Sequence, residues 1–317
     1  MILNTLRNNN SEGPWVQANL NYFHRINGKH LIMKQLSSPL FIVMCLSLLN
    51  SSCGNDNTMK DTLAVDTTTT VVRDTLNNSV TPAAEMVISD IPFPFEILEE
   101  LHSSNIPFDQ KAMNAVSNTP KYNQYNSKAL NLGVFGADLA YVVTYEEFSQ
   151  IGTYVKSAKK LADELNIPFA FNQDMMDKYN RFKSNKDSLT QVVYTSYNEV
   201  DKSLKGDERV GIAALVVTGS WLEGLYLSTK TFMNTDKGST NSGLYKTIGN
   251  QKQSLGIVIK LLGEYKKDPY IASLIGELKE ITSQYDQVTS DAVMNEKQLI
   301  AIHQKVEKLR NRIVEGL

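Results

Sequence analysis

The sequence predicts an all-α protein, a single bundle of antiparallel helices that ends in a long helical hairpin. After residue 86, apolar residues recur at spacings of three and four through most of the chain, which is the period of an amphipathic helix. Two further stretches, 130–143 and 212–227, are apolar nearly all round, as buried helices are. No alternation typical of a strand runs for a comparable length.

Prolines, glycines and short polar runs separate the helical segments. We expect helices or helical pairs over residues 95–104, 109–116, 123–166, 172–183, 187–205 and 207–232, and two or three more within 244–317. Thr144 and Glu147 have the spacing of a capping box, which predicts a break between two helices inside the third range. Gly206 follows a last turn that contains lysine, and this predicts a helix end.

The last two helices show the clearest pattern. Apolar residues recur at Ile271, Leu274, Leu278, Ile281, Tyr285 and Val288 in the first, and at Leu299, Ile302, Val306, Leu309 and Ile313 in the second. The polar residues 289–291 separate the two runs. These seams predict an antiparallel hairpin, and each is too short to be a free-standing coiled coil. We therefore expect the hairpin to pack on the rest of the bundle.

The two apolar stretches carry small residues at helical spacing. They are Gly133, Ala137 and Ala140 in the first stretch, and Ser220, Gly224 and Ser228 in the second. A glycine inside a helix costs about 1 kcal/mol relative to alanine, so another interaction should compensate. Close packing of the two helices against each other is the simplest compensation.

Each of these stretches also contains one acidic residue. A buried and unpaired carboxylate is expensive, so each acid must find a partner or shift its pKa. One interpretation is a pocket between the helices that binds a cationic or polyhydroxyl ligand, or a metal through oxygen ligands. The other is that lysines, tyrosine hydroxyls or backbone N–H groups satisfy both acids, and the sequence does not show whether they meet. The candidate ligand-binding residues are Asn131, Asp138, Tyr141, Trp221, Glu223 and Tyr226.

Known catalytic motifs are missing from the sequence. We therefore expect that the protein is not an enzyme and needs no cofactor, and we assign no metal site. The sequence contains no His-Glu-x-x-His, no Gly-x-Ser-x-Gly and no phosphate-binding glycine loop. The chain after residue 53 contains two histidines, His102 and His303. We expect both to face solvent or to cap helix ends rather than to bind a ligand.

Residues 33–53 form a segment of a different kind. Lys34 lies at its start, an apolar run covers 40–49, and small polar residues lead into Cys53. The run is about half of the roughly 20 residues that a membrane-spanning helix needs. A basic start, a short apolar core and a small-residue exit are typical of a secretory signal peptide.

Because the segment ends on a cysteine, it resembles a bacterial lipoprotein signal, in which Cys53 becomes the lipid-carrying first residue. Ser51 and Ser52 fit that pattern. Asn50 departs from it, and Leu49 lies one place further upstream than the strict pattern requires, as in the looser signals of Bacteroidota lipoproteins. The alternatives are an ordinary cleaved signal and a retained anchor.

This resemblance divides the chain into four parts. We expect residues 33–52 to be the signal peptide. We hypothesise that residues 1–32 are a miscalled N-terminal extension and that Met33 is the true start, because a signal peptide does not normally carry so long a polar extension. Residues 53–85 are rich in Thr, Asn and Asp and contain no aromatic residue, which predicts a disordered tether. Residues 86–317 form the all-helical domain.

Cysteine content and charge exclude further classes of function. Of the two cysteines, Cys45 is removed with the signal and Cys53 is acylated, so the mature chain has no free thiol and no disulfide. The whole chain has a net charge of −2, and removal of residues 1–52, with four basic and one acidic residue, leaves −5. That charge argues against a surface for nucleic acid or for an anionic membrane.

The lipid signal, the tether and the stretch NLGVFGADL at 131–139 together resemble the uncharacterised helical lipoproteins of Bacteroidota. The family transfers no agreed activity. It implies a protein anchored in the cell membrane or outer membrane through the lipid on Cys53. Residues 54–56 lack the acidic cluster of surface-exported members, which favours the periplasmic face.

We therefore expect a non-catalytic binding or scaffolding module of the cell envelope, with another envelope protein as its partner. The alternative is a small-ligand receptor with a buried acidic and aromatic pocket between the two small-residue helices. An exposed apolar patch would favour the scaffold. An enclosed cavity bordered by Asp138 and Glu223 would favour the receptor.

Overall fold

The computed structural model describes residues 94–167, 173–206, 209–235, 242–288 and 294–317. The predicted extension, signal peptide, lipidated Cys53 and tether lie outside these residues. The described residues all belong to one unit. They contain helices and no strand, so the predicted all-α fold is confirmed.

Nine α-helices and two 3₁₀ helices make up the described part of the chain. The α-helices are α3 (Phe95–Ser103), α4 (Tyr125–Thr144), α5 (Phe148–Glu164), α6 (Gln173–Phe182), α7 (Lys186–Gly206), α8 (Val210–Met233), α9 (Ser242–Gly263), α10 (Pro269–Tyr285) and α11 (Glu296–Val314). The 3₁₀ helices η1 (Gln110–Ala112) and η2 (Val116–Lys121) lie between α3 and α4 in the sequence. These bounds agree with most of the predicted ranges.

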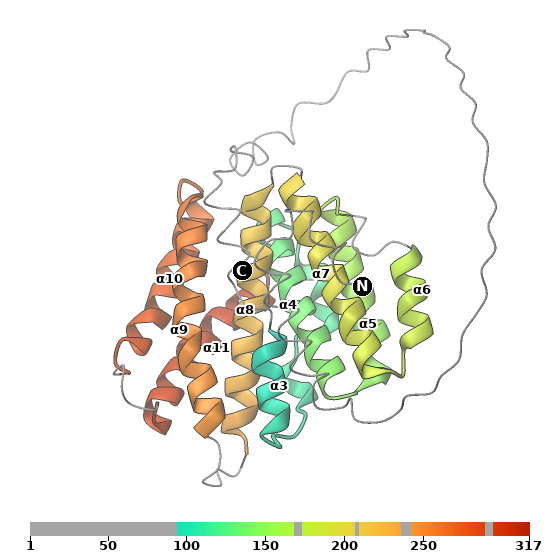
Figure 1. Cartoon of the computed structure of the whole chain (residues 1–317). Helices are drawn as coiled ribbons and strands as arrows, with labels where there is room; N and C mark the ends of the chain where they lie inside the picture. Colours follow the sequence, from blue (N-terminus) through green and yellow to red (C-terminus); the bar gives the residue numbers. More distant parts are fainter. Residues whose placement is uncertain (1–93, 168–172, 207–208, 236–241, 289–293) are drawn as a thin grey trace, which may run out of the picture. The chain divides into compact units, whose positions relative to one another are not determined.

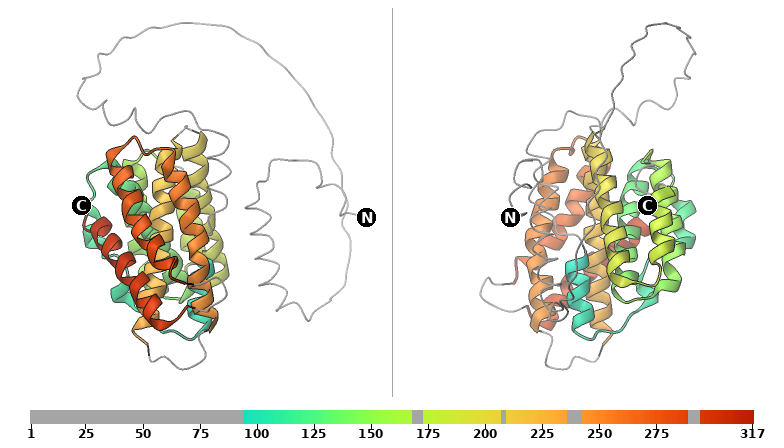
Figure 2. Two further views of the ribbon diagram at one scale, coloured as in Figure 1. Left: turned by 90° about the vertical axis from the view of Figure 1, so that its left-hand side faces the viewer. Right: turned by 45° about the vertical axis from the view of Figure 1, so that its right-hand side comes forward.

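The helices form a bundle with α4 and α8 at its centre (Figure 1). On one side lie α5, α6 and α7, and on the other lie α9, α10 and α11, while α3 packs against α4, α8 and α9. Figure 2 shows the helices of both sides running alongside the central pair. Helix α6 packs mainly on α7, at the edge of the bundle.

The central helix α8 is buried over its whole apolar length. Among the described residues it is the one helix long and apolar enough to cross a membrane, and the apolar window that meets this criterion is 100% buried inside the bundle. Such burial is typical of the core helix of a globular domain. It explains why α8 is apolar all round.

The two small-residue helices pack directly against each other, as predicted. A Cβ atom on Gly133 of α4 would overlap the carbonyl oxygen of Val216 on α8, and one on Gly219 would overlap the carbonyl oxygen of Leu130. The backbones therefore touch at two glycines. Gly224 makes a close contact with a different element, because a Cβ atom at this position would overlap Pro94 at the start of α3.

The terminal hairpin of α10 and α11 is also confirmed. The predicted seam residues up to Tyr285 on α10 and all those on α11 are buried, and Val288 is half-buried. Asp268 caps α10 by accepting hydrogen bonds from the backbone N–H groups of Tyr270 and Ile271, and Asn295 and Gln298 form a capping box on α11. The hairpin packs on α8 and α9, and α11 also contacts α4.

Two local predictions are wrong. The break between α4 and α5 is present, but Thr144 makes no capping hydrogen bond, and the chain turns through Glu146 in the left-handed region, with φ 60°. The α-helix expected over 109–116 is absent. The segment forms 3₁₀ turns because the backbone N–H of Asn114 bonds to Asp138 on α4 instead of within a helical turn.

Candidate functional site

The two acids of the central helices come together at the contact between α4, α8 and α11. Asp138 and Glu223 are both 0% exposed. Arg310 of α11 reaches them from the terminal hairpin and is itself 6% exposed. The three residues form a buried cluster with two carboxyl groups and one guanidinium, which we call the acid–arginine cluster.

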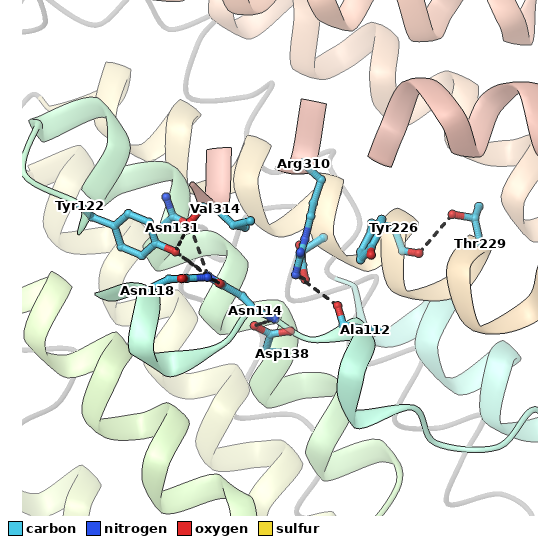
Figure 3. A network of polar contacts seen from close by, with 11 residues as sticks. Ala112, Asn114, Asn118, Tyr122, Asn131, Asp138, Tyr226, Thr229, Arg310 and Val314 are labelled. Carbon is cyan, nitrogen blue, oxygen red and sulfur yellow. Dashed lines mark hydrogen bonds and ion pairs between the residues drawn. The ribbon is translucent and has the colours of Figure 1, made fainter. Parts of the chain in front are cut away.

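Arg310 binds Glu223 through two parallel hydrogen bonds. Its Nε donates to Glu223 Oε2 at 2.9 Å and its Nη2 donates to Oε1 at 2.7 Å. Nη2 also donates to the carbonyl oxygen of Ala112 at 3.2 Å (Figure 3). The guanidinium lies over the ring of Tyr226, 4.5 Å from its centre. This two-point geometry is the strongest form of an ion pair between arginine and a carboxylate.

Asp138 has no such partner. Its Oδ2 accepts the backbone N–H of Asn114 at 3.3 Å, and its Oδ1 has no hydrogen-bond donor among the described residues. Burial raises the pKa of Asp138 well above its usual value, the negative charge of Glu223 raises it further, and Arg310 opposes both. A protonated Asp138 removes the conflict, because its O–H can then donate to the adjacent Glu223 carboxylate.

A second polar network joins this cluster to the end of α11 (Figure 3). Asn114 Nδ2 donates to the hydroxyl of Tyr122 at 2.9 Å, and that hydroxyl donates to the carbonyl oxygen of Val314 at 3.0 Å. Asn131 Nδ2 donates to the carbonyl oxygen of Ile313 at 3.0 Å. The last carbonyls of a helix have no partner within the helix. The network therefore caps α11 with side chains from the region around η2 and α4.

The six candidate residues divide into two groups. Asp138, Glu223 and Tyr226 meet around Arg310, and Asn131 joins them through Asn114. Tyr141 and Trp221 are also buried but bond elsewhere. The Tyr141 hydroxyl accepts the backbone N–H of Asp109 at 2.9 Å, and the Trp221 indole N–H donates to Gln251 Oε1 at 3.0 Å.

Arg310 was not predicted as a site residue, and His303 lies in a different environment from the one predicted. His303 is 3% exposed, and its Nδ1 lies 2.9 Å from the hydroxyl oxygen of Thr229, so the expectation that it faces solvent is wrong. The expectation holds for His102, which is exposed. His303, Val306, Arg310 and Ile313 recur at spacings of three and four. Val306 and Ile313 already belong to the predicted seam, so the position of His303 and Arg310 three residues before them was the available indication that both polar side chains turn inward.

The cluster leaves little room for a ligand. Arg310 already occupies the position that a cationic ligand would take against the two acids. Within the described part of the chain, no group of three or more His, Cys, Asp or Glu residues could hold a metal ion. The acid–arginine cluster therefore has a structural role, because its ion pair holds α11 against the two central helices.

A cavity lies on the other side of α4, among helices α4 to α8. Its volume is about 50 Å³, and its walls include Leu132 and Gly136 of α4, Val155 of α5 and Val193 of α7. Two methionines of α6, Met175 and Met176, also line it. None of the six candidate residues borders it, and neither acid does, so this cavity is not the predicted acidic pocket.

The walls of this cavity carry almost no polarity. The polar side chains among them are Ser196, whose hydroxyl donates to the carbonyl oxygen of Val192, and the half-buried Tyr179 and Tyr197. No charged side chain lines it. An apolar space of this kind favours an uncharged, apolar group as its occupant.

Comparison of the chain with protein-family models, with curated proteins and with solved structures finds no match.

Proposed function

We propose that this chain is a lipid-anchored protein of the bacterial cell envelope whose helical body binds a small apolar ligand without catalysis. The observation that carries the ligand-binding part is the apolar cavity among α4 to α8. Its methionines support adaptable binding, because a flexible thioether side chain fits apolar groups of different shape.

The anchoring part rests on the sequence. Residues 33–52 have the charge, length and exit of a secretory signal, and Cys53 follows them at the position of lipid attachment. A lipid on Cys53 and an otherwise water-soluble helical body describe a protein held at a membrane surface. The membrane partner in this proposal is the lipid bilayer reached through Cys53.

The acid–arginine cluster supports the non-catalytic part of the proposal. A general acid or base must come within hydrogen-bond reach of its substrate. Asp138 and Glu223 are fully buried beneath Arg310 and the end of α11. Their carboxyl groups have partners within the protein or face one another, and this arrangement suits the docking of a helix.

The surface favours ligand binding over scaffolding. A scaffold was expected to show an exposed apolar patch on the terminal hairpin or along the body. Among the described residues, Leu317 is the large hydrophobic residue that is well exposed, at 71%. One residue at the end of the chain makes no patch, whereas the cavity offers apolar contact inside the body.

Methionine-methyl NMR tests ligand binding directly. The full chain with Cys53→Ser, labelled at its methionine methyl groups, is titrated with 1-butanol and 1-hexanol in the absence of detergent. We expect the methyl signals of Met175 and Met176 to shift in a saturable way. Absence of a shift with both alcohols would overturn the proposed ligand site.

Gly136→Leu serves as the blocking variant, with Gly256→Leu as its control. A Cβ atom meets nothing within 4 Å at either position, but Gly136 lines the cavity and Gly256 lies on the exposed face of α9. We expect Gly136→Leu to abolish the shifts and Gly256→Leu to leave them unchanged. Both substitutions should leave their helices intact, since leucine favours the helical conformation more than glycine does.

Lipid attachment is tested separately in bacterial cells. Cells that express the unmodified chain are fed an alkyne-tagged fatty acid, and the tag is read on the purified protein. We expect labelling of the parent chain and its loss in Cys53→Ser. Equal labelling of both would overturn the proposed anchor while leaving the cavity proposal untouched.

A further inference from the structure

An organic ligand needs more room than the apolar cavity offers. The volume of the cavity is about 50 Å³. An engineered apolar cavity that holds benzene measures roughly 150 Å³. Because protein interiors are close-packed, the lining side chains cannot yield far on their own. One wall of the cavity therefore has to move for a ligand to enter.

Four of the helices around the cavity are firmly held in the bundle. Helices α4 and α8 form its centre, α5 packs on α4 and η2, and α7 packs on α4 and α8. The lining residues of α5, which are Ile151, Val155 and Ala158, are all buried. Movement of any of these four helices would disrupt the core of the bundle.

Helix α6 is the remaining wall. It lies at the edge of the bundle and packs mainly on α7 (Figure 1). Of its ten residues, Met175 alone is buried, whereas α5 buries seven. Its other lining residues, Met176 and Tyr179, are half-buried. A helix with so little buried surface belongs to the least stable part of a fold, and lids are drawn from that part.

Two polar contacts of α6 lie within the helix itself. Asp174 and Lys178 form an ion pair at 2.7 Å, and Gln173 Nε2 donates to Asp177 Oδ1 at 2.8 Å. Both contacts persist when α6 leaves α7, so the helix can move as one piece.

The turn at residues 183–185 supplies a hinge between α6 and α7. Its three residues are exposed. Beyond the turn, α7 has its own cap, because Asn185 Oδ1 accepts the backbone N–H of Ser188 at 2.8 Å. Lys186 also pairs with Glu99 of α3 at 3.3 Å. The start of α7 therefore stays in place when α6 moves.

From these contacts we propose that α6 is a lid, which turns on residues 183–185 to admit the ligand and then closes over it. The proposal rests on the proposed function and adds the entry route of the same site. Tyr179 is the latch of this lid. It reaches across to Gly152 of α5, where a Cβ atom would stand 3.3 Å from the tyrosine hydroxyl oxygen.

Hydrogen exchange read by mass spectrometry tests the lid on the full chain with Cys53→Ser. A helix of ten residues is only marginally stable alone, so the amides of α6 exchange when it leaves α7. We expect α6 to exchange at least about tenfold faster than α5 and α7. Saturating 1-hexanol should slow the exchange of α6 and leave that of α10 unchanged. Exchange of α6 as slow as that of α5 overturns the proposal.

A cross-link tests whether the movement of α6 admits the ligand. Gly152→Cys and Tyr179→Cys, in the full chain with Cys45→Ser and Cys53→Ser, are joined by a bis-maleimide about as long as the tyrosine side chain that it replaces. The control is the same chain with both thiols capped by N-ethylmaleimide, and circular dichroism checks that both forms are folded. We expect the cross-link to lower the association and dissociation rates of 1-hexanol at least about tenfold, as read from the methionine methyl signals of α6.

Tyr179→Ala gives a second comparison, with Tyr245→Ala as its control. Tyr245 is also half-buried, but it lies on α9 against Phe232. We expect Tyr179→Ala to raise both rates roughly tenfold, because it removes the apolar contacts of a half-buried aromatic ring. Tyr245→Ala should leave both rates unchanged. Equal rates in the two alanine variants, or in the cross-linked and capped chains, overturn the lid.

The binding of 1-hexanol to the parent chain separates this proposal from the proposed function. If 1-hexanol binds the parent and its rates do not respond to the cross-link or to Tyr179→Ala, the apolar site stands and the lid falls. If 1-hexanol does not bind the parent, both proposals fall.

Discussion

Arg310 binds Glu223 with both arms of its guanidinium, at 2.9 and 2.7 Å, across 87 residues of sequence. The pair joins α11 to α8 in a place that water does not reach, since the side chains of Arg310 and Glu223 are 8% and 0% exposed. Because Asp138 lies against the same pair, the charge balance of the bundle's centre depends on one arginine from the terminal hairpin.

Arg310→Met should destabilise the fold by about 3–5 kcal/mol, because it leaves a buried carboxylate without its counter-charge. The double variant Arg310→Met with Glu223→Gln should recover part of that loss, because no charge remains unpaired. Urea unfolding followed by circular dichroism measures both values. As a control, Lys305→Met breaks the exposed Lys305–Glu280 pair and should change the free energy of unfolding by less than about 1 kcal/mol. Equal losses in the two single variants would contradict this account.

Asp138→Asn should cost no stability at neutral pH and should gain some, because asparagine replaces the protonated carboxyl that this environment favours and needs no proton from the solvent. Its amide can donate to Glu223 as the protonated acid does. Glu223→Gln should be far more harmful, since it leaves Arg310 buried without a carboxylate. Urea unfolding of the two variants gives the comparison, and a loss in Asp138→Asn as large as that in Glu223→Gln would rule out a protonated Asp138.

The same residue predicts a pH dependence. The pKa of Asp138 is raised in the folded state, mainly by burial, so the folded chain binds a proton that the unfolded chain releases above about pH 4. Its contribution is fully present below that pH and is lost as pH rises toward the folded-state value. The stability of the parent relative to Asp138→Asn should therefore fall between about pH 4 and pH 7, by at most about 1.4 kcal/mol per pH unit. A difference that stays constant over this range would contradict the prediction.

His303 predicts a pH dependence of stability with the opposite sign. Burial lowers its pKa, the nearby Lys230 lowers it further, and Glu307 opposes both. The unfolded chain therefore binds a proton at His303 more readily than the folded chain does, and stability is lost as pH falls below about 6.5. His303→Gln should lose less stability than the parent when the pH is lowered from 7 to 5, as measured by thermal unfolding at each pH. An identical slope in both chains would show that His303 does not titrate against the fold.

The glycines of α4 make a prediction about packing. Gly133→Ala places a methyl group into the backbone of α8 and should destabilise the fold by about 1–3 kcal/mol or more. Gly136→Ala, three residues further along the same helix, places it in the cavity and should stabilise the fold by up to about 1 kcal/mol. Thermal unfolding compares the two. If they have the same sign, α4 and α8 do not make the close contact described above.

Much of the fold could be predicted from spacing alone. The seams of α10 and α11 and the apolar stretches in α4 and α8 repeat along one helix, so the sequence displays them directly. The contact of α4 with α8 also followed from Gly133. Gly219 was not identified, because the small residues of α8 recur at several registers and only the neighbour decides which one faces α4.

The arrangement of the site was less accessible. Asp138 and Glu223 were identified as unusual because an acid stands out in an apolar helix. Their shared partner, Arg310, lies on α11, 87 residues after Glu223, and nothing in the spacing of the sequence links it to either acid. The apolar cavity was not predicted at all. It exists because Gly136, Ala158 and the residues of α7 do not fill the space among helices α4 to α8, and a void of that kind has no pattern along any one helix.

Because Glu223 depends on Arg310 for its counter-charge, an incomplete copy of the chain should differ in stability from a complete one. Glu223, Asp138, Asn131 and Tyr122 are all made before Arg310 and the α11 carbonyls that complete their interactions. A chain broken off by proteolysis or early termination before Arg310 keeps an uncompensated charge between its two central helices. We expect such a fragment to be less stable than the complete chain and, because proteases cleave the open form, to be degraded faster.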